Sequence, residues 1–137
     1  MRYRSITALA LGLAVSLPAS AEVLHVQGQF KVEHGATNTV GGGIGGKLDT
    51  VKDTLTYHLH YRGLTGPINA IHLHGPADDG QDAGVLVPVP GPYTTKMHGV
   101  LHLTADQVKD IQDGKTYFNL HTAAHADGEA RAQLMAK

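Results

Sequence analysis

Apolar residues recur mostly at every second position from Glu22 to the end of the chain. Clusters of Gly, Pro, Asn and Asp interrupt this alternation about every ten residues, a spacing typical of the short strands of a β-sandwich or β-barrel. Helix-length periodic segments are almost absent. The alternation predicts strands at residues 23–33, 40–48, 54–61, 69–74, 85–89, 97–103, 116–122 and 129–135.

One segment favours a helix. Thr104 is followed three residues later by Gln107, the spacing of a capping box, and the helix that it opens is expected to end near Gly114. The predicted fold is therefore all-β: an antiparallel, Greek-key-like β-sandwich or barrel of about eight strands with one short connecting helix.

The first residues resemble an export signal. Arg2 and Arg4 precede an apolar run at residues 6–17, and a small-residue cleavage pattern follows. This run of about 12 residues is shorter than the roughly 20 that a membrane-spanning helix needs, and no later segment is apolar enough to span a bilayer. We predict a signal peptide at residues 1–21 and one exported domain at residues 22–137, periplasmic or secreted.

The composition of the chain excludes several classes of function. The 137 residues include 11 Lys and Arg, 12 Asp and Glu and only 5% aromatic residues, so nucleic-acid binding is not expected. The chain has no Cys, which excludes disulfides, thiolate metal sites and a Cys nucleophile. No serine follows Ser20, which excludes a serine hydrolase. The glycine-rich residues 41–46 lack the Lys-Ser/Thr of a phosphate loop, and we expect an edge strand or a bulge there.

The chain contains 10 histidines. In the predicted strands, alternation places many of them on the face opposite to the apolar residues. These are His58, His60, His72, His74, His98, His102 and His121. Where such strands are neighbours, about 4.8 Å apart, their imidazoles form a patch on the outer surface of one sheet.

This patch predicts a metal site. Imidazoles at positions i and i+2 of a strand lie about 6.6 Å apart at Cβ, close enough to bind one ion. His72 and His74 are the best such pair, and His121 is the third candidate ligand. Candidates for the fourth ligand are His125, His60 and His58. Imidazoles without thiolates suit Cu(II), Zn(II) or Ni(II), and the Irving–Williams order favours copper, with zinc as the alternative.

Three segments carry a family resemblance. They are residues 70–77 (AIHLHGPA), 117–125 (YFNLHTAAH) and 128–134 (GEARAQL). In this order they resemble the signature blocks of the CHRD domain, and residues 54–57 and 63–67 resemble the strand and turn before the first block. The resemblance implies an antiparallel β-sandwich in an exported protein. The matching family positions are His72, His74, His121, Glu129 and Arg131.

Two further expectations concern polar residues near these segments. Glu129 and Arg131 share a face of one predicted strand, and we expect an exposed ion pair worth only about 0–1 kcal/mol. The alternative is that they orient the ring N–H of His121, as metal-binding histidines usually require. His34, between Glu33 and Gly35, is expected to be an ordinary turn residue.

Three functions remain open at this point. The first is binding or buffering of a metal ion, with copper favoured. The second is a copper redox enzyme, because a His-x-His pair followed by a later histidine is similar to the copper site of Cu/Zn superoxide dismutases. The third is an extracellular interaction module with incidental histidines, whose partner is a second copy of the chain, as a homodimer, or an unidentified protein.

Overall fold

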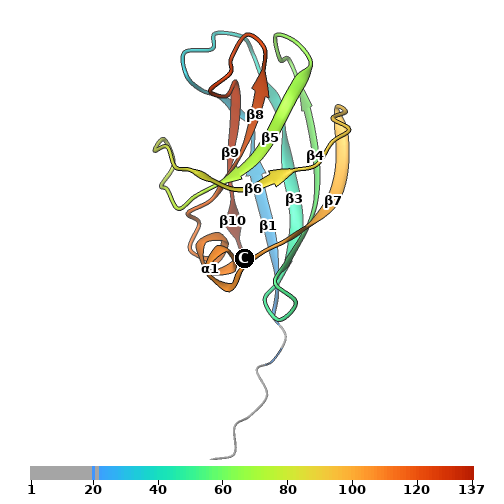
Figure 1. The fold of residues 1–137 in the computed structure, drawn as a ribbon, viewed down its shortest axis with the longest axis vertical. Coiled ribbons are helices and arrows are strands. Elements are labelled where there is room, and N and C mark those ends of the chain that lie inside the picture. Colours follow the sequence, from blue (N-terminus) through green and yellow to red (C-terminus); the bar gives the residue numbers. More distant parts are fainter. Residues whose placement is uncertain (1–19, 21) are drawn as a thin grey trace, which may run out of the picture.

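The structure, a computed structural model, describes residue 20 and residues 22–137. The predicted signal peptide at residues 1–21 therefore lies outside the described residues, except for Ser20 (Figure 1). In the described part of the chain, no helix has the length and apolar character needed to cross a membrane.

The described strands form two antiparallel five-stranded sheets packed face to face (Figure 1). In the order of hydrogen-bonded neighbours, the first sheet contains β10 (Met135–Ala136), β1 (Val23–Gln29), β3 (Gly41–Asp49), β4 (Thr54–Arg62) and β7 (Lys96–His102). The second sheet contains β2 (Lys31–Val32), β9 (Ala130–Gln133), β8 (Tyr117–Thr122), β5 (Ile68–His74) and β6 (Val85–Val89). The prediction of an all-β antiparallel sandwich is confirmed.

Two of the predicted strands divide between the sheets. Residues 23–33 form β1 and β2, and the chain changes sheet at Phe30. Residues 129–135 form β9 and β10, and the change occurs at Leu134. Phe30 is 4% exposed and Leu134 is 0% exposed. Each crossing residue is therefore buried, and the two crossings join the layers covalently along one side.

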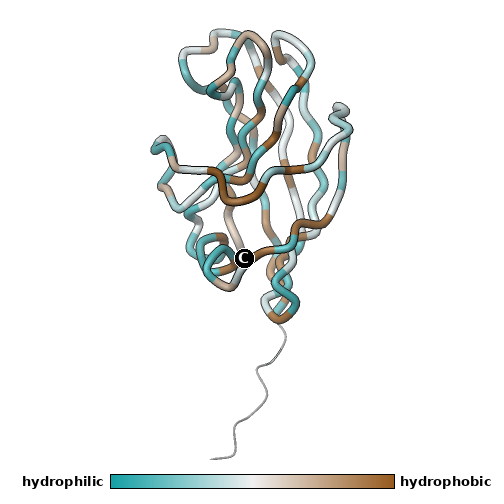
Figure 2. The backbone as a smooth tube through the Cα atoms, viewed as in Figure 1, coloured by the Kyte–Doolittle hydropathy of each residue, from teal (hydrophilic) through white to brown (hydrophobic). Residues whose placement is uncertain are grey.

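The core lies between the two sheets. β4 contributes Leu55 and Leu59, and β5 contributes Ile71 and Leu73, all of them buried. Figure 2 shows apolar residues recurring along strands of both layers, as the alternation predicts. β8 differs because all 6 of its residues are buried. Its outward-facing side chains must therefore be covered by loops, and this cover matters for the site described below.

The glycine-rich β3 lies inside the first sheet, between β1 and β4. Its pairing with both neighbours is continuous, so the prediction of an edge strand or a bulge at residues 41–46 is wrong. The glycines permit close approach instead. A Cβ on Gly45 would lie 2.8 Å from the His58 ring, and a Cβ on Gly42 would meet the backbone carbonyl oxygen of His60. Gly42 also has a φ of +114°, which favours glycine.

The predicted helix is confirmed as α1 (Ala105–Gln112). The Gln107 backbone N–H donates to Thr104 Oγ1 over 3.2 Å, and the Thr104 backbone N–H donates to Gln107 Oε1 over 3.0 Å. These two bonds complete the capping box. Val108 and Ile111 are buried in the core, so the helix covers one end of the sandwich (Figure 1).

Candidate metal centre

Three imidazoles meet on the outer face of the second sheet. His72 and His74 lie on β5, and His121 lies on β8, the strand hydrogen-bonded to β5. One donor atom from each ring lies within 4.8 Å of the other two. Nδ1 of His72 is 3.1 Å from Nε2 of His121. Two nitrogens bound to one ion at about 2.0–2.1 Å would lie roughly 2.9–3.4 Å apart, so this spacing suits a shared ion.

Backbone carbonyls fix the tautomers of two of these rings. Nδ1 of His74 lies 2.9 Å from the Ala83 carbonyl oxygen, and Nδ1 of His121 lies 2.9 Å from the Ala126 carbonyl oxygen. Since a carbonyl only accepts, each Nδ1 carries the proton and each Nε2 has a lone pair, which in His121 faces Nδ1 of His72. Nε2 of His74 is buried and has no hydrogen-bond partner among the described residues. This pattern of a carbonyl on one ring nitrogen and a free second nitrogen is typical of metal-binding histidines.

The His74 ring also lies at one end of a stack of planar groups. The ring of Tyr117 lies parallel to it, with centroids 5.0 Å apart and an interplanar angle of 6°. On the Tyr117 ring lies the guanidinium of Arg131, 3.5 Å from the centroid. Arg131 is only 7% exposed and is therefore held in place by its surroundings. The stack on this fixed guanidinium limits rotation of His74 about its side-chain bonds.

The segment between β5 and β6 is anchored over this stack. Arg131 donates to the carbonyl oxygens of Gln81 and Asp78 over 2.6 Å and 2.9 Å. The Ala83 backbone N–H donates to the Tyr117 hydroxyl over 3.1 Å. The same anchored segment supplies the Ala83 carbonyl that holds His74. Sequence reasoning singled out neither Tyr117 nor this carbonyl. Alternation could have found Tyr117, which shares a strand face with His121, but backbone carbonyls leave no sequence signal.

The electrostatics favour neutral rings at the cluster. Burial lowers the pKa of His72 below its usual value of 6.5, and the neighbouring rings of His121 and His74 lower it further. Burial also lowers the pKa of His74, although the Ala83 carbonyl opposes this effect. A neutral imidazole is the form that binds a metal ion. Both rings are therefore available as ligands at neutral pH.

The other predicted histidines lie elsewhere. His58 and His60 are on β4 of the first sheet, with His98 paired to His58 from β7, so they do not reach the cluster on the second sheet. The expected histidine patch therefore divides between the sheets, with one group on the neighbouring strands β5 and β8 and another on the neighbouring strands β4 and β7. His125 lies in the turn after β8, where its backbone N–H donates to the Thr122 carbonyl oxygen, and it does not belong to the cluster.

Glu129 and Arg131 correct a further expectation. Glu129 is 0% exposed, and it accepts hydrogen bonds from Asn38, Thr65 and Thr122 rather than pairing with Arg131. Burial alone would raise the pKa of Glu129, but these hydrogen bonds together hold it below the usual 4.5. The expected exposed ion pair is therefore wrong. The alternative, in which these residues orient His121, is wrong too, since the Ala126 carbonyl accepts its ring N–H.

The sequence was also compared with known proteins. No curated protein and no solved structure matched the chain. The family model of the CHRD domain matches residues 23–134, which include all three clustered histidines and both crossings between the sheets. The chain therefore belongs to the CHRD domain family.

Proposed function

We propose that the protein binds one metal ion, copper in preference to zinc, through His72, His74 and His121. The observation that carries the proposal is the fixed orientation of His74 and His121, whose Nε2 lone pairs are set by the Ala83 and Ala126 carbonyls. Three imidazole donors without a thiolate or carboxylate suit Cu(II) and Zn(II), and the Irving–Williams order places copper first. Binding or buffering of the ion outside the cytoplasm is the role that we infer, given the predicted signal peptide.

The number of protein ligands bears on a redox role. Three ligands leave a fourth position to water or an external ligand, as in metal sites that perform catalysis. In the dismutase-like alternative, superoxide would reach the copper at this open position, and the copper would alternate between two oxidation states. Superoxide disproportionation by the copper-loaded protein favours this alternative, while a copper-loaded protein without such activity favours binding or buffering.

Isothermal titration with Cu(II) and with Zn(II) tests the proposal. We expect a dissociation constant below micromolar for copper. His74→Gln should lose at least the roughly 10- to 100-fold that loss of a ligand's supporting partner costs, because the ligand itself is removed. The matched control is His58→Gln, which removes an exposed imidazole from the first sheet. Copper affinity weaker than micromolar, or an equal loss in both variants, would contradict the proposal.

A further inference from the structure

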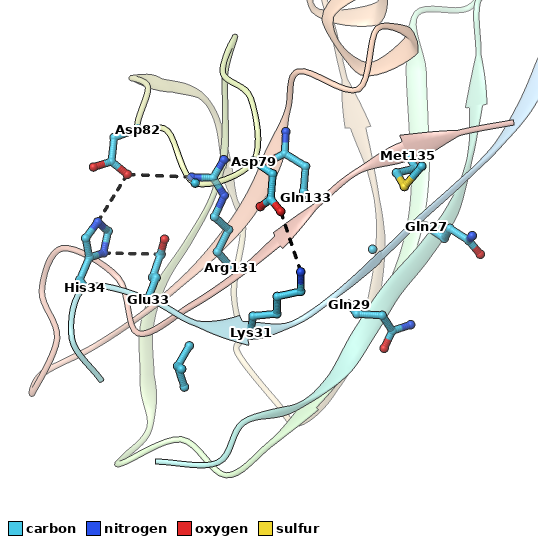
Figure 3. Close-up of a pocket in the computed structure, with 13 residues that line it drawn as sticks. Gln27, Gln29, Lys31, Glu33, His34, Asp79, Asp82, Arg131, Gln133 and Met135 are labelled. Carbon is cyan, nitrogen blue, oxygen red and sulfur yellow. Dashed lines mark hydrogen bonds and ion pairs between the residues drawn. The ribbon is translucent and has the colours of Figure 1, made fainter. Parts of the chain in front are cut away.

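A second group of side chains whose residue types serve as metal ligands lies at one end of a cavity of about 590 Å³. Glu33 and His34 follow β2, and Asp82 comes from the segment between β5 and β6 (Figure 3). One donor atom from each of the three lies within 4.8 Å of the other two. The group shares no residue with the three-histidine cluster. His34 lies in a turn, as predicted, but a turn position alone does not explain why its ring meets two carboxylates.

The His34 ring faces three acceptors, one of which is Glu33 Oε1, 3.7 Å from Nδ1 (Figure 3). Nδ1 lies 3.3 Å from the Gly128 carbonyl oxygen, to which it donates when it carries the proton. Nε2 then has a lone pair, and it lies 3.4 Å from Oδ1 of Asp82, which is also an acceptor (Figure 3). Only a proton or a metal cation can reconcile these two atoms. His34 has a φ of +49°, a strained conformation for a residue other than glycine, so the local structure holds the ring in this place at a cost.

Two buried oxygens beside His34 point to a cation independently. Glu33 Oε1 and Asn119 Oδ1 are buried and accept no hydrogen bond from any described residue. Each lies 2.5 Å from the position that a Cβ on Gly128 would take, as does Asn119 Nδ2, so the Glu33 carboxylate and the Asn119 carboxamide converge on the space that this glycine leaves open. The Asn119 residue is 2% exposed and the Glu33 side chain 11%. Glu33 Oε1 has His34 Nδ1 as a charged neighbour at 3.7 Å, which is too long for a hydrogen bond, and buried acceptors without a hydrogen bond call for a donor or a positive ion.

The charges near the group leave room for a cation. Arg131 is the nearest fixed positive charge, and its guanidinium lies 4.0 Å from Asp82 Oδ1. That guanidinium is already engaged with the Gln81 and Asp78 carbonyls and with Gln133, so it offsets one carboxylate without reaching Glu33 Oε1.

We propose that Glu33, His34 and Asp82 form a second divalent-cation site, with the Asn119 carboxamide oxygen beside it. Its two carboxylates and one imidazole suit Mn²⁺ or Zn²⁺, whereas the cluster on β5 and β8 has nitrogen donors only. Donor atoms around one ion lie closer together than the 4.8 Å within which these three fall, and Asp82 is free to move towards the others because its side chain is 72% exposed.

Mn²⁺ titration followed by ¹H–¹⁵N NMR tests the site in the intact protein. We expect paramagnetic broadening centred on the amides of residues 33, 34, 82 and 128, and at least a tenfold loss of Mn²⁺ affinity in Asp82→Asn. The matched control is Asp79→Asn, which removes an exposed carboxylate from the same segment and should retain the wild-type affinity. Broadening elsewhere, or equal effects of the two variants, overturns the proposal.

Two further measurements separate this site from the three-histidine site and from simple protonation. The broadening should persist in His74→Gln, so the second site stands even if the copper proposal fails. Zn²⁺ added at constant pH should shift the ¹⁵N resonance of His34 Nε2. If Zn²⁺ leaves that resonance unchanged and Mn²⁺ causes no local broadening, a protonated His34 alone links the two carboxylates and the cation site is rejected.

Discussion

Glu129 shows how a single buried charge is held in this protein. One of its oxygens accepts from Asn38 and from the Thr65 backbone, and the other accepts from the Thr65 and Thr122 hydroxyls. These partners come from segments distant along the chain, so the carboxylate ties the turn before β5 to the end of β8. Hydrogen bonds to a charged group contribute about 1.5–3 kcal/mol each in favourable cases.

Glu129→Gln should lower the free energy of unfolding by about 2–3 kcal/mol at pH 7, because the charge-assisted hydrogen bonds are lost and the Gln NH₂ fits only if the Thr65 and Thr122 hydroxyls turn to accept. The carboxylate has a lowered pKa in the folded protein, so its contribution is present above the unfolded value of about 4.5 and is lost as pH falls through the folded value. Urea denaturation from pH 7 to pH 3 measures both effects. The variant should lose less stability than the wild type over the acid range; a parallel pH dependence would contradict this account.

At the scale of elements, the order of the strands determines whether the histidines meet. β5 and β8 are neighbours, and their pairing sets Ala70 opposite His121 and His72 opposite Asn119. The segment between β5 and β6 then covers the site, held by Arg131 and Tyr117. Orientation of the metal ligands is therefore a property of a strand pair and its covering loop together.

Tyr117→Phe should weaken copper binding by about 10-fold while keeping the ring that stacks on His74. The change removes the hydroxyl that holds Ala83, so the carbonyl on His74 Nδ1 is less well placed. Tyr93→Phe is the control, because it removes a hydroxyl bonded to Val89 away from the cluster. Isothermal titration of both variants compares them, and equal copper affinity in the two would argue against a role for the anchored loop.

Sequence patterns predict the strands and their faces but not which strands are neighbours. Alternation identifies the strands and the outward side of His72, His74 and His121, since it depends only on the pleat. It also gives the correct side for His58 and His60 but cannot assign them to a sheet, because strand order depends on contacts between distant segments. The Glu33, His34 and Asp82 group lies in loops, where no periodicity operates. The buried state of Glu129 depends on partners that no local pattern indicates.

At the scale of the whole molecule, the crossings at Phe30 and Leu134 make the two layers one cooperative unit. β1 continues into β2 and β9 continues into β10, so neither sheet can separate without disturbing the other. The buried crossing residues occupy the shared core. We therefore expect one unfolding transition for the described domain rather than two.

Leu134→Ala should cost about 2–5 kcal/mol of unfolding free energy, because it leaves a cavity at a fully buried crossing. Val100→Ala is the matched control on β7, where the side chain is half exposed and the change should stay within about 0.5 kcal/mol. Urea denaturation followed by far-UV and near-UV circular dichroism gives both values. Separate transitions by the two probes would contradict the expected single cooperative unfolding of the domain.

The carbonyls of Ala83 and Ala126 have a kinetic consequence. Because they already hold the Nδ1 protons of His74 and His121, these two rings need neither a proton shift nor a ring flip when an ion arrives. His72 differs, because its Nδ1 donates to the lone pair on His121 Nε2, so this contact has to break and the proton has to leave Nδ1 before both nitrogens can bind one ion. The rearrangement needed for uptake is therefore confined to His72, while the other two rings are oriented in advance.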